Sequence, residues 1–127
     1  MVGARGRLVL LLALLASCSS PSSLHVPEGE WGGRNLELVV GGTSASGTFK
    51  CGAMGRIEQP LVLDASGEFD APGTYDPVLV TGGPRPARYS GSLSGSTLVV
   101  TVTLQGAAVG TFELARSRPA AYDVCNF

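Results

Sequence analysis

Histidine, lysine and cysteine are scarce in this 127-residue sequence, and their scarcity limits its chemistry. A serine hydrolase needs a histidine as general base, but the one histidine, His25, lies in a serine- and proline-rich stretch that we expect to be solvated. The sequence also contains no G-x-S-x-G turn, no phosphate-binding loop and no C-x-x-C pair. These absences argue against the familiar enzyme classes, and we predict a non-enzymatic protein without a cofactor or a metal.

The sequence also lacks an excess of charge of either sign. Nine basic residues stand against ten acidic ones, which gives a formal net charge of −1 at pH 7. Arg5 and Arg7 lie at the N-terminus, so the rest of the chain is mildly acidic. Nucleic-acid binding requires a basic patch or stripe, and the sequence has none. We therefore predict no nucleic acid among the partners.

The sequence has no apolar run long enough to span a membrane. The run Leu8–Ala16 would be roughly 14 Å long as a helix, about half the thickness of a hydrocarbon core. With Arg5 and Arg7 in front of it, the run is typical of the apolar part of a secretory signal peptide. We place that signal at residues 1–17.

The segment L-A-S-C that ends at Cys18 resembles the lipobox read by lipoprotein signal peptidase. The resemblance implies that the chain is cut before Cys18 and that the cysteine carries a diacylglycerol. Stable anchoring requires two or more acyl chains. We expect a lipid-anchored protein of the bacterial cell envelope, with residues 18–30 as a flexible tether. Ser19, rather than Asp, follows the cysteine, and this resembles the signal for the outer membrane of a Gram-negative cell.

Helical periodicity is also absent, and a period of two takes its place from Trp31 onward. No window of ten residues has the apolar period of a helix, and 18 glycines and 8 prolines oppose helices. Seven to nine short strands at a spacing of about ten residues predict an all-β domain over residues 31–127. A small antiparallel meander barrel is our first choice because closure removes exposed edges, and a sandwich is the second. The expected strands are 36–40, 45–51, 56–59, 61–63, 69–75, 87–93, 97–104, 112–114 and 122–125.

Two cysteines remain once Cys18 is lipidated. Cys51 and Cys125 form an even pair in an oxidising compartment, so we predict a disulfide between them. It would close a loop of roughly 75 residues, worth about 4 kcal/mol in the chain-entropy model. The alternative, a reactive thiol or a metal ligand, lacks a histidine within the folded part. The alternation of the second strand puts Cys51 on the same face as Phe49 and Lys50 on the opposite face.

Several motifs resemble a group of uncharacterised bacterial secreted proteins and lipoproteins. They cover most of residues 31–127 and imply a shared fold, with no activity to carry over. The motifs are W-G-G at 31–33, a cysteine at 51, D-A-S-G-E-F at 64–69, G-T-Y at 73–75, P-A-R-Y-S-G at 86–91 and a terminal cysteine at 125. The A-R-Y-S-G part also resembles lipidated inhibitors of C-type lysozyme, which implies lysozyme inhibition as an alternative function.

Arginine, tyrosine and tryptophan are enriched at binding surfaces, which makes Arg85, Arg88, Tyr89 and Trp31 the candidate recognition residues. A purely structural interpretation competes with this one. Tyr89 would then belong to the core, Arg88 would point outward from a strand, and Trp31 would close one end of the barrel.

Carboxylates are the only dense group of one functional type, namely Asp64, Glu68, Asp70 and Asp76. They could bind calcium, but their spacing does not match an EF-hand loop, and an aspartate that starts a glycine-containing turn bonds its own backbone. Glu68 and Asp70 lie on one face of a strand, so a carboxylate-based enzyme stays as an alternative.

The main functional hypothesis is a binding or interaction module at the cell envelope. It would bind an envelope protein, or a small apolar molecule inside the barrel. A passive envelope component is a further possibility. Glycine and alanine on the expected inner faces favour a tight, filled interior over a hollow one.

Overall fold

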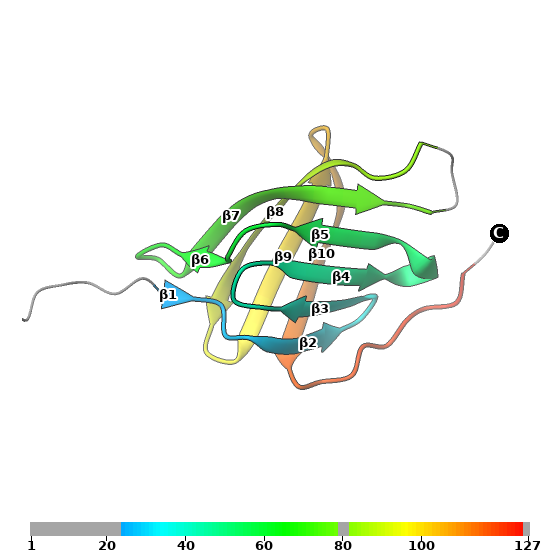
Figure 1. Cartoon of the computed structure of the whole chain (residues 1–127). Coiled ribbons are helices and arrows are strands. Elements are labelled where there is room, and N and C mark those ends of the chain that lie inside the picture. The colour runs from blue at the N-terminus through cyan, green and yellow to red at the C-terminus, as the bar shows by residue number, and fades with distance from the viewer. Residues whose placement is uncertain (1–23, 79–81, 126–127) are drawn as a thin grey trace, which may run out of the picture.

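The all-β prediction is confirmed by a computed structural model, which describes residues 24–78 and 82–125. Eight antiparallel strands form a closed barrel (Figure 1). They are β2 (Gly29–Gly33), β3 (Leu36–Val40), β4 (Ala45–Phe49), β5 (Met54–Ile57), β7 (Glu68–Asp76), β8 (Arg85–Ser94), β9 (Thr97–Leu104) and β10 (Ala107–Arg116). Neighbours in the barrel follow each other along the chain, as in a meander, and β10 closes the circle against β2. The predicted signal peptide and Cys18 lie outside the described residues.

A two-stranded ribbon lies beside the barrel and includes residues of the predicted tether. β1 (Leu24–His25) pairs with β6 (Val62–Leu63), and the backbone N–H of Val26 donates to the carbonyl of Leu61. Val26 is 2% exposed. Strand pairing and burial of Val26 therefore hold residues 24–26, which we predicted as part of a flexible tether, against the barrel.

Two predicted strand segments have a different structure. β4 ends at Phe49, and a 3-10 turn, η3 (Lys50–Gly52), follows it in place of a strand that runs on to Cys51. Cys51 has a φ of 65°, in the left-handed region and outside the range of a regular strand. The expected last strand over residues 122–125 is absent from the described part of the chain. Because β10 already pairs with β2, the closed barrel offers it no free edge.

The barrel interior is filled by alternate residues of the strands. Leu98, Val100 and Val102 of β9 are fully buried, as the period of two predicts. Tyr89 on β8 lies inside the barrel against Gly73 of β7 and Gly55 of β5, and its hydroxyl donates to the carbonyl of Thr74 at 2.6 Å. A Cβ atom on Gly55 would lie 2.0 Å from that hydroxyl, so only glycine leaves room for the ring.

The predicted disulfide is confirmed. Cys51 and Cys125 are bonded, with their Cα atoms 5.7 Å apart. The bond joins η3 to the tail that follows β10 rather than joining two strands. The tail also accepts a hydrogen bond from the N–H of Asn35 at the carbonyl of Ala121, and the Tyr122 hydroxyl donates to the carbonyl of Thr48.

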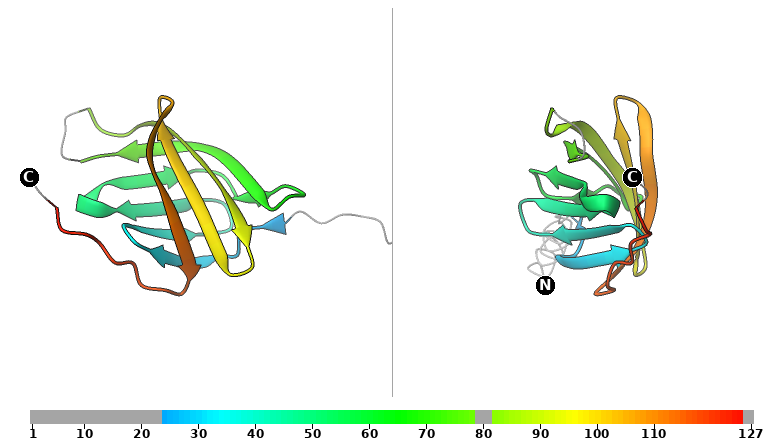
Figure 2. Two further views of the ribbon diagram at one scale, coloured as in Figure 1. Left: turned by 180° about the vertical axis from the view of Figure 1, so that it is seen from behind. Right: turned by 90° about the vertical axis from the view of Figure 1, so that its right-hand side faces the viewer.

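The two ends of the barrel differ in what covers them. β1 lies at one end, and η3 lies at the other, near the end of β7 (Figures 1 and 2). Val26 and Leu61, each 2% exposed, cover the β1 end. Cavities of similar size lie at both ends, one of about 280 Å³ beside Val26 and Leu61 and one of about 250 Å³ at the η3 end, described below.

Candidate functional site

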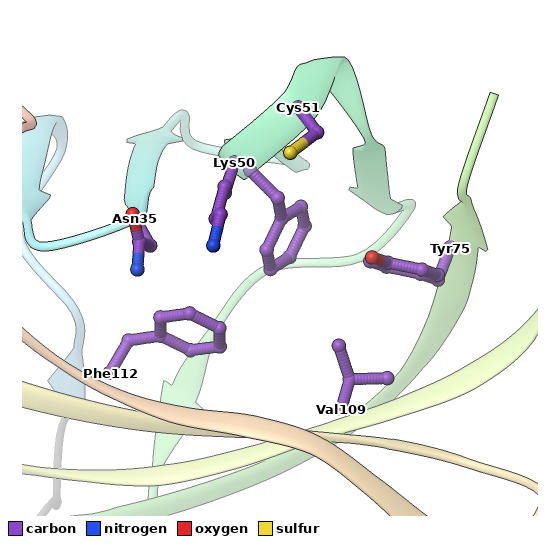
Figure 3. Close-up of a pocket in the computed structure, with 7 residues that line it drawn as sticks. Asn35, Lys50, Cys51, Tyr75, Val109 and Phe112 are labelled. Carbon is purple, nitrogen blue, oxygen red and sulfur yellow. The ribbon is translucent and has the colours of Figure 1, made fainter. Parts of the chain in front are cut away.

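A cavity of about 250 Å³ opens at the η3 end of the barrel, and we call it the mouth. It is lined by side chains from four separate segments of the chain, several of which are labelled in Figure 3. The lining residues are Asn35, Phe49, Lys50, Cys51, Tyr75, Val109 and Phe112.

Three aromatic rings form the apolar wall of the mouth. Phe49 ends β4, Tyr75 is near the end of β7, and Phe112 lies on β10. The ring of Phe49 packs edge-to-face on Tyr75 at 5.1 Å and on Phe112 at 5.5 Å between centroids. Such pairs contribute about 0.5–1.5 kcal/mol each beyond the area they bury. Phe49 is 4% exposed, whereas Tyr75 and Phe112 are only partly buried and leave apolar surface open to a ligand.

Val109 completes the apolar wall from an irregular position. The pairing of β10 with β9 shifts register between Ala108 and Gly110, so Val109 is the extra residue of a β-bulge. Bulges are common at the rims of barrels and beside active sites, where they redirect a side chain. The side chain of Val109 points into the mouth (Figure 3), and the residue is 36% exposed.

Two polar groups also line the mouth. The amino group of Lys50 and the hydroxyl of Tyr75 both point into it (Figure 3). Burial raises the pKa of the Tyr75 hydroxyl, so this group remains a neutral hydrogen-bond donor at neutral pH. Among the described residues it has no hydrogen-bond partner.

Hydrogen bonds join Asn35, which lines the mouth, to Asp123. Asn35 has a φ of 68°, which asparagine tolerates better than other residues with a Cβ. Its amide nitrogen donates to the carboxylate of Asp123 at 3.0 Å, and its amide oxygen accepts from the backbone N–H of Asp123 at 2.8 Å. The Asn35 amide and the guanidinium of Arg34, at 3.1 Å, hold the pKa of Asp123 below its usual value.

Two of the four predicted recognition residues are buried. Trp31 is 2% exposed, and its ring N–H donates to the carbonyl of Pro27. Tyr89 is 1% exposed. Tyr89 therefore belongs to the core, as the structural interpretation expects, and neither side chain is exposed to contact a partner.

The other two recognition candidates are exposed, but they do not line the mouth. Arg88 donates to the carboxylate of Asp70 at 2.8 Å, and both side chains are more than half exposed. Exposed ion pairs of this kind contribute about 0–1 kcal/mol. Arg85 begins β8 and is exposed as well. The Arg-Tyr pair behind the resemblance to lysozyme inhibitors thus offers only its arginine to a partner.

The acidic group is divided among separate local interactions. Asp64 accepts hydrogen bonds from the backbone N–H groups of Ser66 and Glu68 and from the Ser66 hydroxyl, and these bonds lower its pKa. Asp76 accepts from the N–H of Val78 at 2.8 Å. Within residues 24–78 and 82–125, no three His, Cys, Asp or Glu side chains come together as a metal site.

Comparison with protein-family models, with curated proteins and with solved structures finds no match to this chain. Fold and site therefore define only a class, a small closed meander barrel with a filled interior and an aromatic-lined cavity at its η3 end. Sequence reasoning placed Phe49, Tyr75 and Phe112 on strand faces but did not combine them into a site. The available signal was an aromatic residue near the end of each of two strands, Phe49 and Tyr75. The only lysine of the sequence, Lys50, directly follows Phe49.

Proposed function

We propose that this chain is a lipid-anchored, non-enzymatic binding protein of the bacterial cell envelope, and that its mouth takes up the apolar part of a small ligand. One observation carries the proposal. Tyr75, Val109 and Phe112 come from two distant strands, yet they leave their apolar surface exposed around a single cavity. Concave, mostly apolar sites with a few polar groups are the usual form of small-molecule sites.

The size of the mouth limits the ligand. At about 250 Å³ the cavity falls slightly below the range of roughly 300–1,000 Å³ that is usual for drug-sized ligands. The interior behind it is occupied by Tyr89 and by the buried residues of β9. The ligand is therefore a small molecule, or it enters with only one ring or one chain end.

The lipid anchor in the proposal rests on the lipobox-like segment that ends at Cys18. From Cys18 to Leu24 the backbone reaches at most about 20 Å, so an anchored domain stays close to the membrane. β1 lies at the end of the barrel opposite η3, which turns the mouth away from that membrane (Figure 1). No helix within the described ranges is long and apolar enough to cross a membrane.

Binding of a neutral apolar probe tests the proposal. The chain from residue 18, with Cys18→Ser to prevent lipidation, is exported behind a cleavable signal peptide and titrated with the fluorescent probe N-phenyl-1-naphthylamine. We expect saturable binding at one site per chain. Val109→Trp fills the mouth and should weaken binding of the probe by at least about tenfold. A tenfold loss corresponds to about 1.4 kcal/mol, roughly the free energy of burying one apolar side chain.

Val39→Trp is the matched control, because Val39 is 42% exposed on β3 and does not line the mouth. This variant should bind like the parent. Absence of saturable binding by the parent would overturn the proposal, and so would equal binding by the two tryptophan variants. If a pull-down recovered an envelope protein with the parent and not with Val109→Trp, the proposed ligand would be a protein instead of a small molecule.

A further inference from the structure

We infer that the mouth selects an apolar ligand that carries one anionic head group, and that the ammonium group of Lys50 holds this head. The inference rests on the proposed function and names its ligand class. It follows from the position of Lys50, from the charges around it and from the hydroxyl of Tyr75.

The turn η3 brings Lys50 to the mouth. Alternation along β4 would continue to place residue 50 on the outer face, opposite Phe49. Instead the N–H of Phe49 donates to the carbonyl of Ala53, and the N–H of Lys50 donates to the carbonyl of Asn35. The chain turns sharply here, and the lysine side chain projects into the same space as Tyr75 (Figure 3). The disulfide at Cys51 holds this turn to the tail.

Lys50 forms no ion pair with a carboxylate among the described residues. In the described ranges the ion pairs are Arg34–Asp123, Arg56–Glu58 and Arg88–Asp70. All of them use arginine, and none includes the only lysine of the chain. An ammonium group without a paired carboxylate, beside an apolar wall, is complementary to an anion with an apolar body.

Asp123 is the carboxylate whose pKa Lys50 helps to lower, although less than Asn35 and Arg34 do. It lies beyond ion-pair distance from Lys50 and is already engaged by Arg34 and by both polar atoms of the Asn35 amide. Asp76, near the end of β7, accepts from the N–H of Val78. Neither carboxylate therefore competes directly with a ligand for the Lys50 ammonium.

The geometry also provides a second donor for the anion. The Tyr75 hydroxyl points into the mouth and has no partner among the described residues, so it is available to donate to the head group or to a polar atom next to it (Figure 3). Charge-assisted hydrogen bonds are shorter and roughly twice as strong as neutral ones. We expect a preference of about tenfold or more for an anion over a neutral ligand of the same shape.

Octanoate and octanamide form a suitable pair of probes, because they share one chain and differ in charge. Each is titrated by calorimetry into the exported chain with Cys18→Ser. Octanoate should bind about tenfold more tightly, and its advantage should shrink as salt is added. Lys50→Gln should make the two affinities equal, whereas Lys50→Arg should preserve the preference for octanoate. Arg88→Gln, which removes a positive charge away from the mouth, is the matched control and should change neither affinity.

A second measurement needs no variant, because the chain contains a single lysine. Acetylation of the Lys50 amino group with acetic anhydride, followed by peptide mass mapping, should be slowed by octanoate and not by octanamide. The inference would be overturned if the parent bound the two probes with equal affinity. It would also be overturned if Lys50 were acetylated at the same rate in the presence of octanoate as in the presence of octanamide. Saturable binding of N-phenyl-1-naphthylamine would still stand in that case, so failure of the anion inference is distinguishable from failure of the proposed function.

Discussion

Removal of the Cys51–Cys125 disulfide should greatly lower the free energy of unfolding of this protein. The two cysteines are 74 residues apart in sequence. In the chain-entropy model a cross-link that closes a loop of that length destabilises the unfolded state by about 4.4 kcal/mol. A domain of this size has a total stability of about 5–15 kcal/mol, so the bond supplies a large share of it.

The native state should change little when the bond is removed. The tail keeps the hydrogen bonds of Ala121, Tyr122 and Asp123 to the barrel, so the expected loss is close to the full entropic value. Urea unfolding of the variant with Cys51→Ala and Cys125→Ala measures it. With a slope of about 1.5 kcal/mol/M, the urea midpoint should fall by about 3 M relative to the parent with Cys18→Ser.

Unfolding of the parent in the presence of a reductant is the control for lost packing, because it breaks the cross-link and keeps every side-chain atom. Both experiments should give the same loss. A loss below about 1 kcal/mol in both would refute the reasoning, since it would mean that the unfolded chain is already restricted without the bond.

The remaining predictions concern the core, the surface charges and the inhibitor resemblance. Tyr89→Phe leaves the carbonyl of Thr74 without its donor and should cost about 1–2 kcal/mol in urea unfolding, with no change in fold. Gly55→Ala places a methyl group against Tyr89 and should cost about 1–3 kcal/mol, whereas Gly42→Ala, whose nearest neighbour is the flexible end of a glutamate, should be close to neutral. The pKa of Asp123 is lowered in the folded state. The ionised carboxylate therefore stabilises the fold fully above the ordinary aspartate pKa of about 3.9, and this stabilisation is lost as the pH falls through the lower pKa of the folded state. Asp123→Asn should flatten the decline of the urea midpoint in this pH range. A lysis assay with a C-type lysozyme should show unchanged rates on addition of the exported chain, because the tyrosine of its Arg-Tyr pair is buried.

The strands were predictable wherever the pattern of period two was long. β9 spans Thr97–Leu104 in the structure, the same residues that the alternation indicated. The pattern failed at the end of β4, because Cys51 continues the alternation of Phe49 in the sequence while its backbone turns into the left-handed region. It failed again after residue 121, because a short apolar run does not show whether a sheet edge is free to accept it.

The mouth was harder to predict than the fold. Its aromatic residues belong to strands far apart in the sequence, and only the closure of the barrel brings Phe49 within 5.5 Å of Phe112. Two local irregularities then add Val109 and Lys50, one through a bulge and the other through η3. A strict alternation rule cannot place either side chain, because each lies where the strand geometry breaks down.

The opposite placement of β1 and the mouth argues for the kind of ligand that we propose. If the chain is anchored at Cys18, the membrane lies on the side of β1, where Val26 and Leu61 cover the barrel. A ligand must then reach the mouth through water as a single molecule, rather than sliding in from the lipid. Strongly apolar molecules are sparse in water, whereas a small molecule with one charged head dissolves and still offers an apolar end to bury. The cavity of about 250 Å³ and the unpaired charge of Lys50 therefore favour the same ligand, a short amphipathic anion rather than a whole membrane lipid.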